Sequence, residues 1–451
     1  MLNSSVFKAY DIRGVYGKDW DAEGAGLVAR AFVEEFGLKK VVLGWDMRVS
    51  SPAMVAAIEA GVRASGACVV KVGRVTTPML YFATAGFSGN DAGIMITASH
   101  NPGQWNGMKL LLGDGMPVGE ESGLPRIATR AMSDTPFVDA LVSGAVETRD
   151  VGVAYIEKIF SFVQLDAARP LSLVVDCGNG MSGVNIRDVL ARVPMIAAHV
   201  MYETPDGTFP NHEANPLNEE TLTDLKREVV ARGAALGIAF DGDGDRVGFV
   251  DERGAVVGGD VMTGLVGAIV AAADPGATIL YDLRSRRAVA RAVEAAGGVA
   301  KMSRVGHAFI KKQMREMGAL FAGELSSHFY FQDFFSVECA DLMVLYVLRL
   351  LQETGEPLSA LVAKLQTDAH SGELNFKVRD RAAALAKIEE VFAPRAQAVS
   401  KMDGLLFDMG GWWFNVRPSN TEPLLRLNAE ARDAPILAEH VAEISSLIQT
   451  V

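Results

Sequence analysis

Short apolar runs that end in polar residues recur along the chain, and each is followed by a stretch with the apolar spacing of a helix. In the first block the runs lie at 41–45, 68–72 and 93–96, and the helical stretches between them lie at 52–65 and 78–85. Strands that alternate with helices are typical of a mainly parallel sheet covered by helices. The pattern therefore predicts an α/β domain near the start of the chain.

The same pattern occurs twice more, at intervals of roughly one hundred residues, the size of one ordinary domain. The opening runs of the three copies each end in an aspartate, and these are Asp46, Asp176 and Asp282. A polar loop follows the third strand of each copy, at 97–102, 241–246 and 323–328. Because open α/β sheets place reactive groups at the carboxyl ends of their strands, we expect the three loops to line one cleft.

After residue 366 the pattern changes to strands that alternate between apolar and polar positions. Strands are predicted at 374–378, 412–416 and 424–429, and helices at 382–392 and 436–448. This mixture indicates a smaller α+β domain at the end of the chain.

We therefore expect an α/β protein with three similar α/β domains, whose sheets are mixed but mainly parallel, and a smaller C-terminal α+β domain, all around a central cleft. The predicted domains are 1–144, 145–254, 255–366 and 367–451. The fourth would contribute the loop at 417–423 to the cleft.

Composition and charge exclude several classes of protein. With 49% hydrophobic and 22% charged residues the chain can bury large cores and is not disordered. Its net charge of -12 gives no general attraction for nucleic acid, so we expect no nucleic-acid partner. The N-terminus lacks an apolar signal core, and the longest apolar stretch, 265–273, is too short to span a bilayer, so we expect a cytoplasmic protein with no membrane partner. The widely separated Cys68, Cys177 and Cys339 lie in apolar surroundings, which favours buried free thiols over disulfides or metal ligands.

The loop DGDGDR places Asp241, Asp243 and Asp245 at alternate positions between glycines. Three carboxylates packed this closely repel one another unless a cation neutralises them, and oxygen ligands suit Mg²⁺. A calcium loop is a second interpretation, because Glu252 falls at the twelfth position, but Arg246 stands at the sixth, where that loop needs glycine. A solvated acidic turn is a third.

Ser99 stands where the apolar run 93–96 ends in the sequence TASHNP. A hydroxyl at the end of a buried strand is well placed for chemistry. The alternative is a simple turn, in which serine and asparagine side chains bond their own backbone. Lys109 lies one short loop further along the chain.

Two more loops carry candidate ligands for a small polar molecule. The sequence GELSSH offers the carboxylate of Glu324 and the hydroxyl of Ser326, which can hold neighbouring sugar hydroxyls, unless they form a helix cap. The loop RPSNTEP at 417–423 offers an arginine, hydroxyls and backbone N–H groups, which suit a phosphate dianion, although it is also a hairpin loop. His307 stands at a predicted helix start, where a capping role is equally consistent.

Seven motifs, taken together and in order, resemble those of the α-D-phosphohexomutase family, in particular its phosphomannomutase/phosphoglucomutase branch. They are AYDIRG at 9–14, TASHNP at 97–102, NGMK at 106–109, DGDGDR at 241–246, VGHAFIK at 305–311, GELSSHFYF at 323–331 and RPSNTEP at 417–423. The resemblance runs essentially from end to end and implies four domains around a central cleft.

By this resemblance Ser99 carries a transferable phosphoryl group. Asp241, Asp243 and Asp245 are implied to hold Mg²⁺, with an oxygen of phosphorylated Ser99 as a further ligand, and hexose 1,6-bisphosphate is implied as intermediate and primer. The other catalytic residues that the resemblance implies are Lys109, His100, Arg246, His307 and Arg13. The implied substrate-binding residues are Tyr10, Glu324, Ser326, His328, Arg417, Ser419, Asn420 and Thr421.

The implied reaction interconverts mannose 1-phosphate and mannose 6-phosphate, and also the glucose phosphates, in a monomer or dimer whose partners are hexose phosphates. A phosphoglucosamine mutase is an alternative, but that branch typically carries glutamine at the position of Leu325. A sugar phosphatase that uses the same serine is a further hypothesis, and a catalytically silent binding protein is another. Ser327 stands where many members of the family have glycine.

Overall fold

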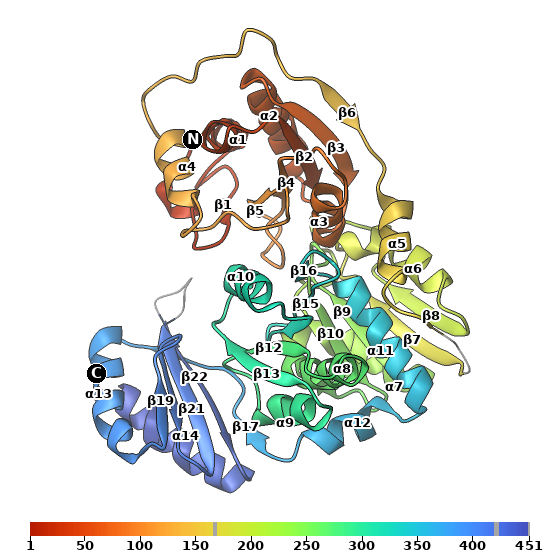
Figure 1. Cartoon of the computed structure of the whole chain (residues 1–451), viewed down its shortest axis with the longest axis vertical. Helices are drawn as coiled ribbons and strands as arrows, with labels where there is room; N and C mark the ends of the chain where they lie inside the picture. The colour runs from red at the N-terminus through yellow and green to blue at the C-terminus, as the bar shows by residue number, and fades with distance from the viewer. Residues whose placement is uncertain (166–168, 419–423, 450–451) are drawn as a thin grey trace. The chain divides into compact units, whose positions relative to one another are not determined.

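The computed structural model describes residues 1–165, 169–418 and 424–449, which fold into two compact units (Figure 1). The first unit contains residues 1–259 and 326–359, and the second contains residues 260–325 and 360–451. The four predicted domain ranges and the central cleft stay predictions. Among the helices of the described residues, none is long and apolar enough to cross a membrane.

The first unit opens with a six-stranded mixed sheet in the order β1-β5-β4-β2-β3-β6. Its strands are β1 (Ile12–Val15), β2 (Lys40–Trp45), β3 (Cys68–Arg74), β4 (Ala92–Ile96), β5 (Trp105–Leu112) and β6 (Val146–Thr148). Strands β2, β3, β4 and β6 are parallel, whereas β5 is antiparallel to both β4 and β1. Every residue of β4 is buried, as expected for a strand in the middle of a sheet covered on both faces.

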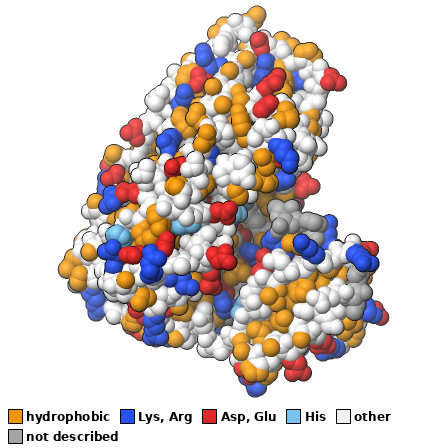
Figure 2. Space-filling model, turned by 180° about the vertical axis from the view of Figure 1, so that it is seen from behind, with side chains coloured by type: hydrophobic (Ala, Val, Ile, Leu, Met, Phe, Trp, Pro, Cys, Tyr) orange, Lys and Arg blue, Asp and Glu red, His pale blue; other side chains and the backbone are white. Residues whose placement is uncertain are grey.

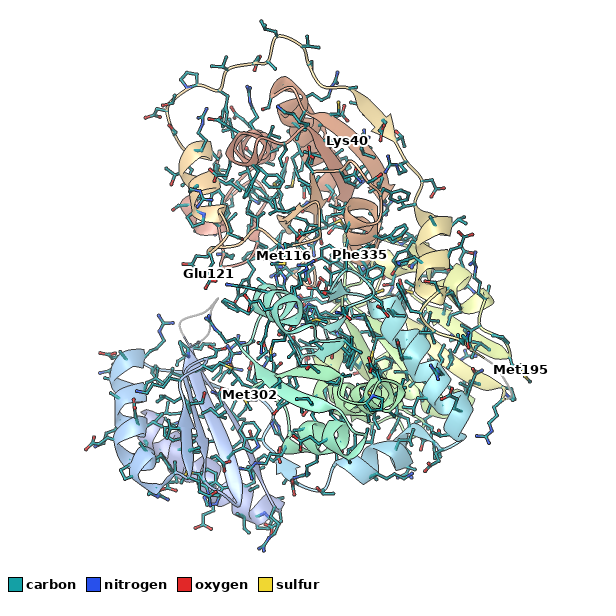
Figure 3. The ribbon with its side chains drawn as sticks, in the orientation of Figure 1. Lys40, Met116, Glu121, Met195, Met302 and Phe335 are labelled. Atoms are coloured by element: carbon teal, nitrogen blue, oxygen red, sulfur yellow. The ribbon has the colours of Figure 1, made fainter. Side chains whose placement is uncertain are left out.

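Four helices accompany this sheet: α1 (Ala22–Phe36), α2 (Ser51–Ala64), α3 (Thr77–Ala85) and α4 (Leu124–Ala131). Helices α1 and α2 lie side by side (Figure 1). They meet at glycines, because a Cβ on Gly61 would stand 2.6 Å from the carbonyl oxygen of Gly26. Lys40 begins β2 (Figure 3), and its Nζ lies 3.1 Å from Glu147, which ties β2 to the segment around β6.

A second sheet of the first unit has the order β11-β10-β9-β7-β8. Its strands are β7 (Leu171–Asp176), β8 (Ile196–Met201), β9 (Leu236–Phe240), β10 (Val247–Asp251) and β11 (Val256–Val257). The helices of this part are α5 (Gly152–Phe160), α6 (Ile186–Ala191), α7 (Thr223–Arg232) and α11 (Ala340–Thr354), and a short hairpin is formed by β15 (Phe329–Phe331) and β16 (Val337–Glu338). Strands β7, β8 and β9 are parallel and β10 is antiparallel, so this sheet is also mixed.

The second unit contains parallel strands β13 (Val299–Ser303), β12 (Thr278–Asp282) and β14 (Phe321–Gly323). Helices α8 (Gly259–Ala273), α9 (Arg287–Ala295), α10 (His307–Met317) and α12 (Leu358–Leu365) belong to the same part of the chain. Its C-terminal part is an antiparallel sheet of β17 (Ala369–His370), β18 (Leu374–Lys377), β19 (Ala398–Ser400), β20 (Leu405–Asp408), β21 (Trp412–Pro418) and β22 (Leu424–Ala431), with α13 (Arg381–Phe392) and α14 (Ala434–Gln449).

The predicted α/β architecture with mixed sheets and a distinct C-terminal α+β domain is confirmed. Several elements differ from the sequence-based expectation. Helix α1 and strands β1 and β5 are absent from the predicted elements. The helix that the repeat pattern predicts after the first strand of the second copy, at 184–192, is a 3₁₀ turn (Met181–Val184) followed by the short α6. All three thiols are free; Cys177 and Cys339 are buried as expected, but Cys68 at the start of β3 is only half-buried.

Candidate active site

Ser99 lies three residues beyond the end of β4, and it is 1% exposed. Its Oγ donates a hydrogen bond to Asp241 Oδ2 at 2.8 Å and lies 3.2 Å from His100 Nδ1. Its backbone has a φ of 51°, in the left-handed region that few residues other than glycine adopt. The Ser99 side chain therefore faces another loop of the first unit, which a simple turn does not explain.

The metal-loop candidate, residues 241–246, connects β9 to β10. Asp241, Asp243 and Asp245 are at most 2% exposed, and each offers a carboxylate oxygen within 4.8 Å of the other two. A Cβ on Gly242 would stand 2.4 Å from the carbonyl oxygen of Ser99, so only glycine permits this approach of the two loops. Burial of this kind does not fit a solvated acidic turn. The loop leads into paired strands β10 and β11, whereas a calcium loop is followed by a helix.

Lys109 is the nearest cation to these carboxylates. Strand β5 carries it opposite Met95 of β4, and its Nζ donates to Asp243 Oδ2 at 2.8 Å and also to Asp245 Oδ2. Burial alone would lower the pKa of Lys109, but the two carboxylates raise it, so the ammonium stays charged. Burial and the charges of Asp245 and Asp243 raise the pKa of Asp241 to about 8.

The three carboxylates fit a hard divalent cation. Oδ1 of Asp243 is buried and accepts no hydrogen bond from any described residue, whereas its Oδ2 accepts from Thr77 Oγ1 at 2.7 Å and from Lys109. Lys109 and Arg246, whose Nε lies 3.7 Å from Asp241 Oδ2, supply two positive charges against three buried carboxylates, and the uncompensated negative charge is costly in a buried site. Oxygen-only donors are those that Mg²⁺ prefers.

Arg246 and His328 form one edge of this group, since residues 246 and 328 pair through a β-bridge. Arg246 Nε donates to His328 Nε2 at 3.1 Å, and that nitrogen also lies 3.5 Å from Asp245 Oδ1. On the other side of the ring, Ser326 Oγ lies 3.2 Å from His328 Nδ1. Glu338 of β16 offers a buried carboxylate to the same group, and no sequence motif identifies it.

Arg13 reaches the Ser99 loop from β1. Its Nη1 donates to Asn101 Oδ1 at 2.7 Å, and its Nη2 donates to Asp11 Oδ2 at 2.5 Å. Tyr10 lies half-buried in the bend before β1. Burial and the nearby cations Arg246 and Arg13 lower the pKa of His100 well below its ordinary value, so its imidazole is neutral at pH 7.

The second unit contains another group of predicted residues. Glu324 follows β14 and is 2% exposed; its Oε1 accepts a hydrogen bond from the backbone N–H of Gly306 at 3.2 Å. Gly306 immediately precedes α10, whose first residue is His307. The hydrogen bond therefore joins Glu324 of the GELSSH loop to the VGHAFIK motif. Arg284 Nη2 lies 3.8 Å from Glu324 Oε1.

Three arginines surround one carboxylate in the same unit. Glu373 lies 3.1 Å from Arg417 Nη2, 3.0 Å from Arg426 Nη1 and 3.5 Å from Arg284 Nη1. Burial would raise the pKa of Glu373, but the three guanidinium groups lower it. Arg417 is 2% exposed near the end of β21, whereas Ser419, Asn420 and Thr421 lie outside the described residues.

The structure thus brings most of the predicted residues into two groups. In the first unit these are Ser99, His100, Lys109, Asp241, Asp243, Asp245, Arg246, His328, Ser326 and Arg13. In the second unit they are Glu324, His307 and Arg417. A hydroxyl beside buried carboxylates that can hold a metal, with several cations nearby, is an arrangement suited to phosphoryl transfer. Figure 2 shows acidic and basic side chains intermixed over the visible face.

Sequence and structure comparisons agree over the whole chain. Phosphoglucomutase/phosphomannomutase alpha/beta/alpha domains I, II and III match residues 4–135, 153–254 and 258–368, and the C-terminal domain of that family matches residues 373–447. The chain is 39% identical over 457 residues to a phosphomannomutase of Salmonella montevideo, and 37% identical over 458 residues to a phosphomannomutase of Escherichia coli, with 100% of both chains covered in each case.

Solved structures agree with these matches. A phosphoglucomutase/phosphomannomutase family protein from Burkholderia thailandensis has a TM-score of 0.91 at 34% identity, covering 100% of this chain and 98% of that one. Parafusin, a phosphoglucomutase from Paramecium, shares the fold with a TM-score of 0.79 at 17% identity, covering 94% and 92% of the two chains. With all four of its domains matched in order, the chain belongs to the phosphoglucomutase/phosphomannomutase family.

Proposed function

We propose that this protein is a phosphohexomutase that interconverts mannose 1-phosphate and mannose 6-phosphate, and also the corresponding glucose phosphates, through phosphorylated Ser99. The observation that carries the proposal is the buried contact between Ser99 Oγ and Asp241 Oδ2 at 2.8 Å, inside a group of three carboxylates and Lys109. Phosphoryl transfer depends mainly on positioning and on neutralising the phosphoryl oxygens, and these residues supply both.

In the first step the phosphoryl group moves from Ser99 Oγ to the free hydroxyl of a hexose monophosphate. The bond between phosphorus and Oγ breaks as a bond to the sugar oxygen forms. The sugar hydroxyl loses its proton to a basic group of the site, and the departing Oγ takes up a proton to become the Ser99 hydroxyl. Asp241, Asp243 and Asp245 would hold Mg²⁺, which would neutralise phosphoryl oxygens. Lys109, held charged by its two carboxylate partners, contributes positive charge beside them.

The product of this step is a hexose 1,6-bisphosphate, which must turn end for end before the second phosphoryl group returns to Ser99. The Ser99 hydroxyl then loses its proton. Two acceptors lie within reach of this proton: His100 Nδ1, at 3.2 Å from Oγ, and Asp241 Oδ2, which accepts the Oγ hydrogen bond at 2.8 Å. Turning requires a substrate site that accepts either end of the sugar, and a free bisphosphate would prime the enzyme when Ser99 is unphosphorylated.

The remaining predicted residues are those that we propose bind the substrate. Arg417, with Ser419, Asn420 and Thr421, would hold the phosphate that is not transferred. Glu324, Ser326 and His328 would contact the sugar or its hydroxyls, with Tyr10, Arg13, Arg246 and His307 completing the site. Guanidinium and backbone donors suit a phosphate dianion at either end of the sugar.

The test is ³¹P NMR of mannose 1-phosphate incubated with the protein, Mg²⁺ and a trace of glucose 1,6-bisphosphate. Growth of a mannose 6-phosphate signal supports the proposal, and parallel runs with glucose 1-phosphate and glucosamine 1-phosphate rank the substrates. Release of inorganic phosphate would instead indicate a phosphatase. No conversion of any of the three sugars would favour a binding protein.

A further inference from the structure

Arg48 is a fully buried arginine beneath the Ser99 loop. It follows β2 by three residues and is 1% exposed. Its Nη1 donates to the carbonyl oxygens of Pro102 and Trp105 at 2.7 and 2.9 Å, and its Nη2 donates to those of Ser99 and Asn101 at 2.8 and 2.6 Å. Four carbonyl groups of residues 99–105 therefore converge on one guanidinium group.

Asp46 fixes the other side of Arg48. Its Oδ2 accepts from Arg48 Nε at 3.0 Å, and its Oδ1 accepts from the backbone N–H of Arg48 at 3.0 Å and from Ser51 Oγ at 2.8 Å. All five guanidinium N–H donors thus have acceptors. The ring of Phe209 lies over the guanidinium at 5.4 Å, and a Cβ on Gly207 would stand 2.5 Å from Arg48 Cα, so the polar segment around these two residues packs against Arg48.

The same turn occurs in the other two repeats, at the aspartates that end their first strands. Arg284 donates its backbone N–H to Asp282 Oδ1 at 2.8 Å, and Asp282 Oδ2 accepts from the N–H of Leu325 at 2.8 Å, which anchors the loop that carries Glu324. In the second repeat Gly178 donates its N–H to Asp176 Oδ1 at 2.8 Å. The aspartate turn is therefore common to the three repeats and belongs to the fold. The hydrogen bonds from Arg48 to the Ser99 loop belong to the first repeat.

We propose that Arg48 is a positioning residue that holds the 99–105 loop, with Ser99 in its left-handed conformation, against the metal loop. The side chain of Arg48 donates hydrogen bonds to backbone carbonyls and to Asp46 but not to the Ser99 side chain, so its hydrogen bonds act on the reaction through the loop. A left-handed serine costs free energy and persists only where surrounding contacts impose it. The inference rests on the proposed role of Ser99.

The first variant to make is Arg48→Lys. Lysine keeps the charge but has three donors on one atom, so it cannot bridge four carbonyls spread along the loop. A loop displaced by about 1 Å is enough to cost roughly 100-fold in rate. We expect kcat to fall by about 100-fold with KM changed less than about threefold, and amide hydrogen exchange to rise within 99–105 while other peptides are unchanged.

Arg63→Lys is the control, because Arg63 of α2 also bonds a backbone carbonyl, but that of Gly144, which lies outside residues 99–105. Its kcat should equal that of the wild type. If Arg48→Lys fails to fold, Asp46→Asn replaces it, since it removes the anchor of Arg48 and keeps the side-chain shape; a fall in kcat with faster exchange in 99–105 is then the expected result.

A folded Arg48→Lys variant with unchanged kcat overturns the proposal, whether or not its amide hydrogen exchange changes. A lowered kcat with unchanged amide hydrogen exchange in 99–105 overturns it as well. The exchange measurement separates this inference from the proposed function. If the wild type shows no mutase activity, the proposed function fails, but faster exchange in Arg48→Lys still supports the loop-holding role, and unchanged exchange removes that role as well.

Discussion

Replacing Glu373 by glutamine isolates the charge that holds three arginines together. Glu373 has guanidinium nitrogens at 3.0, 3.1 and 3.5 Å, and its side chain is 21% exposed. At an effective dielectric constant of about 20, each contact is a gross attraction of about 5 kcal/mol. Desolvation offsets most of this, but removal of one partner from a buried ionic group typically costs about 3–5 kcal/mol. Because Glu373 is partly exposed and glutamine keeps one of its oxygens, we expect Glu373→Gln to lower the free energy of unfolding by about 2–3 kcal/mol.

The structure also predicts how phosphate changes this loss of stability. In the wild type the negative charge of Glu373 balances part of the positive charge of the three arginines, whereas in Glu373→Gln that positive charge is available to bind a dianion. Inorganic phosphate at about 100 times its Kd for the variant should therefore stabilise the variant by about 2.7 kcal/mol, and the same concentration should stabilise the wild type less. The assay is calorimetric unfolding with increasing inorganic phosphate, with Glu443→Gln as control, because Glu443 has an exposed partner, Arg395.

The pH dependence has a defined sign. The pKa of Glu373 is lowered from its ordinary value of 4.5, so its contribution to stability is complete above that pH and is lost as pH falls through the lowered pKa. Glutamine does not titrate, so the difference in unfolding free energy between wild type and variant should narrow below pH 4.5. Equal stabilisation of both proteins by phosphate, or a difference that does not change with pH, would refute the reasoning.

Two further substitutions probe the first unit. Lys109→Met removes the cation nearest Asp243 and Asp245, so we expect the metal-free variant to lose about 3–5 kcal/mol of unfolding free energy. Mg²⁺ should stabilise this variant more than it stabilises the wild type, and kcat should fall steeply. Thermal unfolding in EDTA and in Mg²⁺ measures this, and equal Mg²⁺ stabilisation of both proteins would contradict it. Gly242→Ala places a Cβ 2.4 Å from the Ser99 carbonyl oxygen and should lower the free energy of unfolding by about 1–3 kcal/mol and reduce activity. Gly411→Ala, whose Cβ would stand in open space, should change neither stability nor activity. A fully active Gly242→Ala protein would show that the close approach of the two loops is unnecessary.

Much of the fold follows from apolar periodicity, but β5 does not. Its sequence, WNGMKLLL, comes after Pro102-Gly103 and contains Asn106-Gly107, both signals for a turn. Gly103 and Gln104 do form a turn, but Asn106 and Gly107 lie inside the antiparallel strand, because pairing with β4 and β1 outweighs local preference. The strand that carries Lys109 is therefore not foreseeable from local pattern.

Parts of the candidate site are equally hidden in the sequence. The repeat pattern identifies Asp46, Asp176 and Asp282 as strand ends, but nothing local to Arg48 shows that it turns inward under residues 99–105. Glu373 and Glu338 stand alone in the sequence, and only tertiary structure places each beside other charged residues. Ser327 has a φ of 63°, which explains why glycine suits this position in many members of the family.

The most direct test of the account is transfer of a labelled phosphoryl group through Ser99. The protein is incubated with labelled glucose 1,6-bisphosphate, separated from it, mapped by mass spectrometry, and then mixed with unlabelled mannose 1-phosphate. We predict label on Ser99, its transfer to hexose phosphates in the chase, and no uptake of label by Ser99→Ala. Label on another residue, unchanged labelling of Ser99→Ala, or release of all label as inorganic phosphate would contradict the account.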